Sequence, residues 1–173
     1  NILTRVTDTH FVARDPRLAA AQAEEFAART RAGHRLLFFP EGTSTDGRRV
    51  LPFKPTLFQG FLAPDLPDGL AIQPVSADYR APDGADPRFY AWWGDMDLGP
   101  HLLSVLAAPR QGGVVVTLHP PLAVSGRTRK SLAVKSEELV RAGVMGAMLD
   151  SGLPAGTPSH ISPVQPTDTP KDA

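Results

Sequence analysis

The 173-residue sequence contains no cysteine, which excludes disulfide bridges and zinc sites built on thiolates. It has no excess charge of either sign, because 18 lysines and arginines balance 18 aspartates and glutamates. A neutral chain has no overall field that would draw it to nucleic acid, so we predict no nucleic-acid partner and expect any anion site to be local. No apolar run approaches the ~20 residues that a membrane-spanning helix needs.

The sequence does contain an alternation of helical and strand-like segments. Asp15 and Pro16 are favourable as helix N-cap and first helical residue, and Gly33 is a favourable stop, so a helix is predicted from Pro16 to Arg31. The other predicted helices cover residues 55–62, 98–107 and 129–150. Strands are predicted over residues 9–13, 36–39, 71–75, 89–93 and 114–118.

This alternation is typical of an α/β fold with a mixed, mostly parallel sheet flanked by helices. The run Leu36-Leu37-Phe38-Phe39 follows a helix and is wholly apolar, so it is predicted to be a strand buried on both faces of the sheet. Residues 1–150 are predicted to form one domain. Residues 151–173 are small, polar and rich in proline, and we predict a disordered tail there.

A polar loop follows the predicted strand at residues 36–39. In open α/β sheets, ligands gather at the carboxyl ends of strands. Gly42 permits close approach of the backbone to a ligand, and Glu41 and Thr43 offer groups that bind hydroxyl or phosphate oxygens. Lys54 and Arg14 are candidates to balance an anionic group. An ordinary connecting loop, in which Glu41 caps a backbone group and Lys54 is solvated, explains these residues equally well.

Four short blocks then resemble one known family. Residues 39–43, Phe-Pro-Glu-Gly-Thr, resemble a block of the phospholipid/glycerol acyltransferase family, which includes the 1-acylglycerol-3-phosphate acyltransferases. Residues 11–14, 51–54 and 72–75 resemble three further blocks in the family's order. The resemblance implies a glycerol-3-phosphate acyltransferase-like fold, with residues 1–150 as the C-terminal part of the domain. It assigns Glu41, Gly42, Thr43, Arg14 and Lys54 to binding of the acceptor substrate.

Two departures from the family pattern bear on the substrate. Ser44 stands where the family often has arginine, and residues 44–47 and 90–97 look more like the lyso-ornithine lipid acyltransferase branch. The implied reaction is transfer of a fatty acyl group from acyl-CoA or acyl carrier protein to the hydroxyl of a lysophospholipid or lyso-ornithine lipid. It implies direct attack without metal or cofactor, by an enzyme of membrane lipid biosynthesis. The implied location is the membrane surface at the cytoplasmic face of the inner membrane.

The family's catalytic His-x4-Asp block is expected to precede Asn1. The string from His10 to Asp15 fits that spacing, but we interpret the match as accidental, because it overlaps the arginine block and Asp15 is a favourable N-cap. No residue of the chain is therefore assigned a catalytic role, and the chain alone is predicted to be inactive. The alternative is a non-catalytic module that binds lysolipids or anions.

Other candidates are weaker. His101 follows Asp95 and Asp97, but without a second ligand cluster these residues are better explained as the start of a helix. No Gly-x-Ser-x-Gly motif is present, so an acyl-serine intermediate is not predicted. Trp92 and Trp93 are compatible with a lipid interface, a core or a lid.

Overall fold

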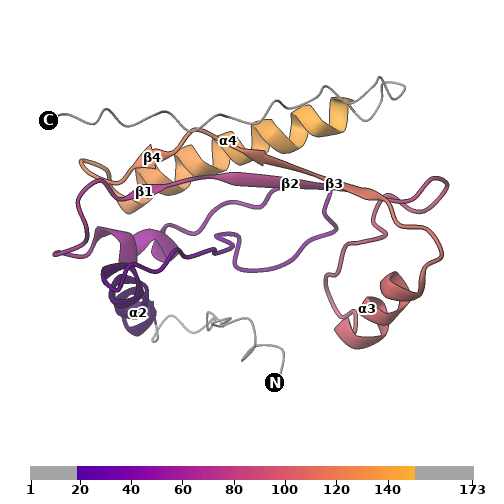
Figure 1. Cartoon of the computed structure of the whole chain (residues 1–173), viewed down its shortest axis with the longest axis horizontal. Helices are drawn as coiled ribbons and strands as arrows, with labels where there is room; N and C mark the ends of the chain where they lie inside the picture. Colours follow the sequence, from indigo (N-terminus) through magenta and orange to yellow (C-terminus); the bar gives the residue numbers. More distant parts are fainter. Residues whose placement is uncertain (1–18, 151–173) are drawn as a thin grey trace, which may run out of the picture.

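The computed structural model describes residues 19–150, which contain eight helices and strands. Their arrangement is shown in Figure 1. In chain order these are α2 (Ala19–Arg31), the 3-10 helix η2 (Pro55–Leu62), β1 (Ala71–Ile72), β2 (Val75–Arg80), α3 (Leu98–Ala107), β3 (Gly113–Leu118), β4 (Leu122–Ala123) and α4 (Arg129–Asp150). The predicted strand at 9–13, Arg14 and the predicted tail lie outside the described residues.

The helices follow local signals in the sequence. Helix α2 ends in a Schellman motif, in which Gly33 has φ of 82° and the N–H of His34 donates to the carbonyl of Arg29 at 3.1 Å. The predicted helices at 55–62, 98–107 and 129–150 are confirmed with their bounds, the first as the 3-10 helix η2. Within residues 19–150 no helix is both long enough and apolar enough to cross a membrane.

The four strands form one interrupted antiparallel ribbon. Strand β1 pairs with β4 and β2 pairs with β3, both antiparallel. Two residues separate β1 from β2 and three separate β3 from β4, so the register shifts by one residue at the break, as at a β-bulge. The break contains Pro74, Pro120 and Pro121, and proline has no N–H to donate to a ladder.

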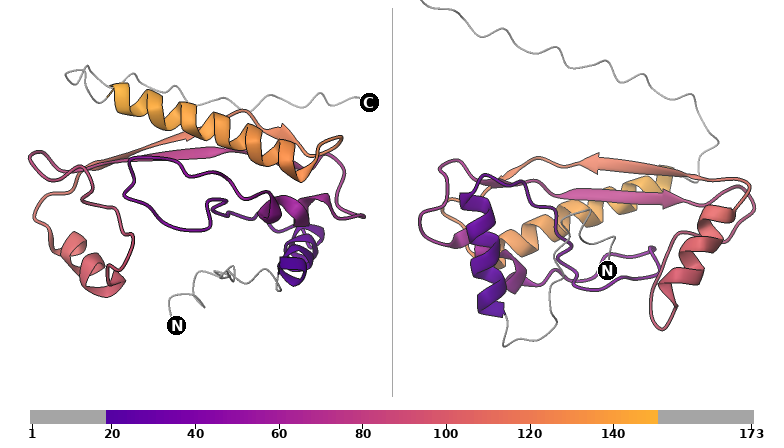
Figure 2. Two further views of the ribbon diagram at one scale, coloured as in Figure 1. Left: turned by 180° about the vertical axis from the view of Figure 1, so that it is seen from behind. Right: turned by 60° about the horizontal axis from the view of Figure 1, so that its bottom comes forward.

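The mostly parallel sheet predicted from the alternation is not found in the described residues, where both strand pairs are antiparallel. A parallel connection needs a crossover helix packed on the sheet. Helix α3, which lies between β2 and β3 in the chain, has no buried residue and lies at the far end of the ribbon from α2 (Figures 1 and 2). The chain therefore returns from β2 to β3 as a long hairpin.

Two other predicted strands are wrong within the described part. Residues 36–39 form no strand, and Leu37 and Phe39 are 80% and 77% exposed, whereas Leu36 and Phe38 pack against the core. Because exposed and packed side chains alternate, only one side of this segment faces the core. Residues 89 and 90 belong to a turn and residues 91–93 form no strand, with the N–H of Phe89 donating to the carbonyl of Asp86 and that of Ala91 to the carbonyl of Arg88.

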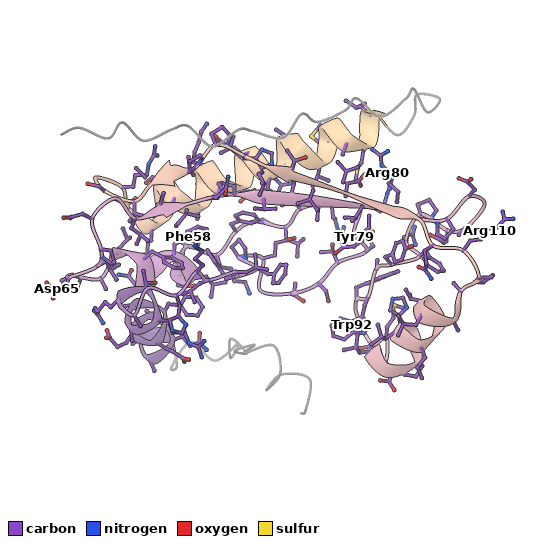
Figure 3. All side chains as sticks on the ribbon, viewed as in Figure 1. Phe58, Asp65, Tyr79, Arg80, Trp92 and Arg110 are labelled. Atoms are coloured by element: carbon purple, nitrogen blue, oxygen red, sulfur yellow. The ribbon has the colours of Figure 1, made fainter. Side chains whose placement is uncertain are left out.

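The core lies where η2 meets α2, α4 and the β1–β4 end of the ribbon. Its buried members are Val50, Phe53, Phe58, Phe61, Ile72, Leu122, Val124, Leu132 and Ala133. Phe58 belongs to η2, is fully buried in this cluster and lies below the ribbon in Figure 3. Phe38 contacts Phe58 edge-on at a ring-centroid distance of 5.3 Å, a geometry that the ring quadrupoles favour.

The β2–β3 half of the ribbon has polar side chains on its buried face and apolar side chains on its exposed face, the reverse of the usual arrangement. Ser76 and Asp78 are buried on the face toward α4. The opposite face is apolar and exposed, with neighbouring side chains drawn from both strands: Val75, Ala77, Tyr79, Val114, Val116 and Leu118. Contiguous exposed apolar surface of this kind marks an interaction site.

Gly60 permits the close packing of η2 against α2. A β-carbon at Gly60 would lie 2.5 Å from the carbonyl oxygen of Ala23 and 2.7 Å from the β-carbon of Phe26. We therefore expect Gly60→Ala to destabilise the fold by about 1–3 kcal/mol, the usual cost of overpacking. Gly146→Ala is the control, since a β-carbon there meets nothing within 4 Å and alanine favours helix α4.

Urea unfolding of the two variants checks this expectation. Gly60→Ala should lower the midpoint and Gly146→Ala should leave it unchanged or raise it. Equal midpoints for the two variants would contradict the contact between η2 and α2.

Candidate functional site

The loop singled out in the sequence, residues 40–49, is called here the Glu-Gly-Thr loop. It follows the half-buried segment 36–39 and folds back so that the backbone N–H of Lys54 donates to the carbonyl of Pro40 at 2.9 Å. Gly42 has φ of 70°, a left-handed conformation that favours glycine, and its N–H donates to the carbonyl of Phe39 at 3.1 Å. The loop therefore makes a tight turn directly before the Thr43 hydroxyl, which lies on an exposed residue.

Lys54 lies directly over Gly42. The last three atoms of its side chain are 2.7–3.2 Å from the position that a β-carbon of Gly42 would occupy, with the ammonium nitrogen nearest. Lys54 is exposed, and its ammonium forms no ion pair with another residue of the described range. An exposed, unpaired cation beside a glycine turn suits an anionic group of a ligand.

Glu41 caps a backbone group, as the alternative of an ordinary connecting loop expects, but the sequence did not identify the donor. Its Oε2 accepts a hydrogen bond from the backbone N–H of Leu51 at 2.7 Å. The carboxylate thus holds the two ends of the Glu-Gly-Thr loop together. Its second oxygen, Oε1, accepts no hydrogen bond from the residues between 19 and 150, and remains available to a ligand.

The structure thus brings Glu41, Gly42 and Lys54 together, with Thr43 adjacent in sequence. Arg14 is outside the described residues, so its predicted place beside Lys54 stays a prediction. A fifth residue joins the group from far along the chain: Glu137 on α4 accepts a hydrogen bond from the backbone N–H of Phe53 at 2.9 Å. No short motif connects residues 53 and 137, so sequence reasoning missed this contact.

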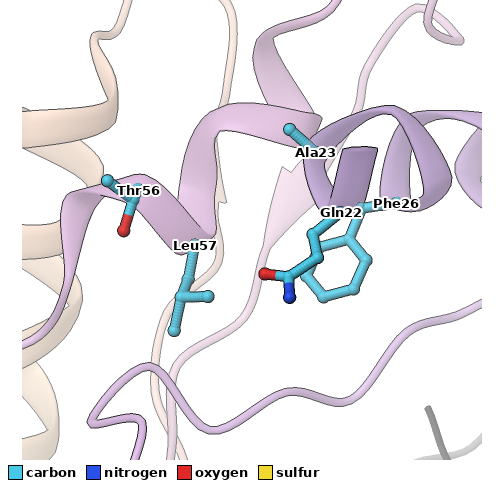
Figure 4. Close-up of a pocket in the computed structure, with 5 residues that line it drawn as sticks. All are labelled: Gln22, Ala23, Phe26, Thr56 and Leu57. Atoms are coloured by element: carbon cyan, nitrogen blue, oxygen red, sulfur yellow. The ribbon is translucent and has the colours of Figure 1, made fainter. Parts of the chain in front are cut away.

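Two hollows lie near this region. One, of about 20 Å³, lies between α2 and η2 and is lined by Gln22, Ala23, Phe26, Thr56 and Leu57 (Figure 4). Its volume is that of about one water molecule. The other is an open depression of about 310 Å³ along residues 61–70 and 124–127. Neither hollow is lined by Glu41, Gly42, Thr43 or Lys54.

A serine–histidine pair also occurs, between Ser76 and His119, with Oγ and Nε2 3.0 Å apart. Ser76 is only 4% exposed and lies against Gly143 of α4. The hydroxyl is therefore packed inside the structure and is not presented to a substrate. Its contact satisfies a buried polar group of the inner face of β2.

The region around α3 does not form a metal site in the described part of the chain. Asp97 precedes α3, and the N–H of His101 donates to its backbone carbonyl, as expected at a helix start. Across residues 19–150, no three side chains of histidine, aspartate or glutamate come together as metal ligands. Trp92 lies in the loop before α3 (Figure 3), and its indole N–H donates to the carbonyl of Met96 in the same loop.

A comparison with known protein families gives a match that includes the Glu-Gly-Thr loop. A family model described as acyltransferase matches residues 1–78, which include the loop and Lys54. Over these residues the chain is similar to the acyltransferase family.

Two relatives show which acyltransferases the chain is similar to. The chain is 54% identical over 143 residues to a lyso-ornithine lipid O-acyltransferase of Rhodobacter capsulatus, a match that covers 82% of this chain and 52% of that protein. It is 38% identical over 144 residues to the lyso-ornithine lipid O-acyltransferase of Brucella abortus, covering 77% of this chain and 53% of that protein. Both relatives are thus lyso-ornithine lipid O-acyltransferases, and the chain spans about half the length of the curated relatives it matches. No solved structure gives a significant match.

Proposed function

We propose that the protein transfers a fatty acyl group to the hydroxyl of a lysolipid, with a lyso-ornithine lipid as the favoured acceptor. The observation that carries the proposal is the unpaired ammonium of Lys54, held over Gly42 in the loop that the acyltransferase family model covers. The names of the relatives support the acceptor class.

In the proposed reaction the acceptor hydroxyl attacks the carbonyl carbon of an acyl thioester, carried by acyl-CoA or acyl carrier protein. An ester bond forms, the carbon–sulfur bond breaks, and the thiol leaves with a proton. A general base must take the hydroxyl proton. We propose that this base is the histidine of a His-x4-Asp block preceding Asn1, as the family resemblance implies, and that this chain supplies acceptor binding.

The residues of the site have separate roles in this proposal. An ornithine headgroup carries a carboxylate and an amino group. Lys54 pairs with the carboxylate, and Glu41 Oε1 faces the amino group or a hydroxyl. Gly42 and Thr43 offer backbone and hydroxyl groups, and we place Arg14 with them. With serine at position 44, Lys54 is the cation that lies over Gly42.

We also propose that the reaction takes place at the membrane surface, on the cytoplasmic face of the inner membrane, because its acceptor is a lipid. The exposed apolar face of β2–β3 is compatible with such a setting.

The test removes the charge of Lys54 and keeps its stem. In the complete gene product, Lys54→Met is expected to raise the KM for lyso-ornithine lipid about 10–100-fold, the range for loss of a hydrogen bond to a charged group. The KM for the acyl donor should stay unchanged. Lys135→Met is the matched control, since Lys135 is exposed on α4 and pairs with Glu138.

Steady-state kinetics with each donor and each acceptor gives the answer. An active wild-type protein whose acceptor KM is insensitive to Lys54→Met would remove Lys54 from the site. Saturable lysolipid binding without acyl transfer from either donor would instead support the non-catalytic module.

A further inference from the structure

Lys54 lies in the segment 51–54, and every backbone N–H of this segment donates a hydrogen bond. Residues 51–54 have three such groups, because Pro52 has none. The N–H of Leu51 donates to Glu41, that of Lys54 to the Pro40 carbonyl, and that of Phe53 to Glu137 Oε2 at 2.9 Å. Two of the three acceptors belong to the Glu-Gly-Thr loop, and the third belongs to α4.

Glu137 is itself held in place. Its other oxygen, Oε1, accepts hydrogen bonds from Arg141 Nε and Nη2 at 3.0 and 2.9 Å, one helical turn further along α4. The Glu137 side chain is 22% exposed, so water screens these contacts only in part. Each oxygen of the carboxylate has a donor, which restricts the rotation of the side chain.

The hydrogen bond fixes the point where the chain passes from core to site. Phe53 is buried among the core residues, and the next residue, Lys54, is exposed with its ammonium over Gly42. If the Phe53 N–H lost its acceptor, it would turn toward water and carry the Lys54 backbone with it. The distance between the ammonium and the Glu-Gly-Thr loop would then vary.

We propose that Glu137 is a positioning residue for recognition of the acceptor: anchored by Arg141, it holds the Phe53 N–H and so keeps the Lys54 ammonium over Gly42. The inference rests on the proposed function and deepens it. Glu137 lies outside residues 1–78, so the acceptor site includes a part of the chain that the family model does not cover.

The experiment compares three variants of α4 in the complete gene product. Glu137→Ala removes the acceptor of the Phe53 N–H. Glu137→Gln keeps an oxygen for that N–H and loses the charge. Glu138→Ala is the control, because Glu138 is exposed on the same helix and pairs with Lys135. Each is combined with Lys54→Met, and thermal stability is recorded alongside the kinetics.

Glu137→Ala is expected to raise the KM for lyso-ornithine lipid about tenfold, with the donor KM and kcat within about twofold. Glu137→Gln should recover most of the acceptor affinity, and Glu138→Ala should match wild type. In the Lys54→Met background the effect of Glu137→Ala should disappear, because the two residues act through one contact. A loss of thermal stability with an unchanged acceptor KM, or additive effects in the double variant, would overturn the inference.

Amide hydrogen exchange separates this inference from the proposed function. Exchange at residues 53 and 54 should accelerate in Glu137→Ala and not in Glu138→Ala. Faster exchange in a protein that neither binds nor acylates lysolipid would mean that the proposed function is wrong while Glu137 still orders the segment. Unchanged exchange in an active enzyme would show that Glu137 does not position Lys54.

Discussion

Phe58→Ala is expected to lower the free energy of unfolding by about 3–5 kcal/mol. Phe58 is 0% exposed and lies at the centre of the core, among side chains from η2, α4 and the segment that precedes η2. Truncation loses the transfer free energy of the ring and leaves a cavity between elements that cannot all close on it. Since small domains have only about 5–15 kcal/mol of stability in total, the variant should lose much of the native state.

Phe39→Ala is the matched control for this measurement. The chemistry of the change is the same, but Phe39 is 77% exposed, and surface substitutions usually change stability by no more than about 0.5 kcal/mol. Urea unfolding followed by circular dichroism should give a much lower midpoint for Phe58→Ala and similar slopes for both. Equal losses in the two variants would contradict the placement of the core around η2.

Gly42→Ala is expected to reduce kcat/KM for the acceptor about 10–100-fold, the same factor that we expect for Lys54→Met. The new β-carbon would lie 2.7 Å from the Lys54 ammonium nitrogen, so the flexible end of the lysine must move away. The fold should tolerate the change with a loss of about 1–2 kcal/mol, because the left-handed backbone at this position disfavours a side chain.

Gly47→Ala separates the two effects of that substitution. Gly47 lies in the same loop with φ of 73°, and a β-carbon there would make only an ordinary contact, at 3.6 Å from the Ala91 β-carbon. Both variants should lose similar stability in urea, whereas only Gly42→Ala should lose acceptor turnover. A similar loss of activity in both would assign the effect to backbone strain and would contradict the role of the Lys54–Gly42 contact.

Much of the candidate site was predictable because its residues are close in sequence. Glu41, Gly42 and Thr43 are consecutive, and Lys54, twelve positions after Gly42, returns to the same loop. The donor to Glu41, the N–H of Leu51, was not predicted, because the sequence gives no sign of which N–H a loop glutamate will meet. Glu137 was not predicted either, since 84 residues separate it from Phe53.

The sequence by itself determined the helices of this protein and the chemical character of the Glu-Gly-Thr loop. Helical hydrogen bonds join residues four apart, and the stop at Gly33 acts within one turn, so this information is local. Only the tertiary structure decided that residues 36–39 form no strand, that β2 and β3 pair antiparallel, and that α4 holds the segment carrying Lys54. The physical reason is that a strand, or a carboxylate that accepts a distant N–H, depends on a partner whose identity is set by the packing of the whole chain.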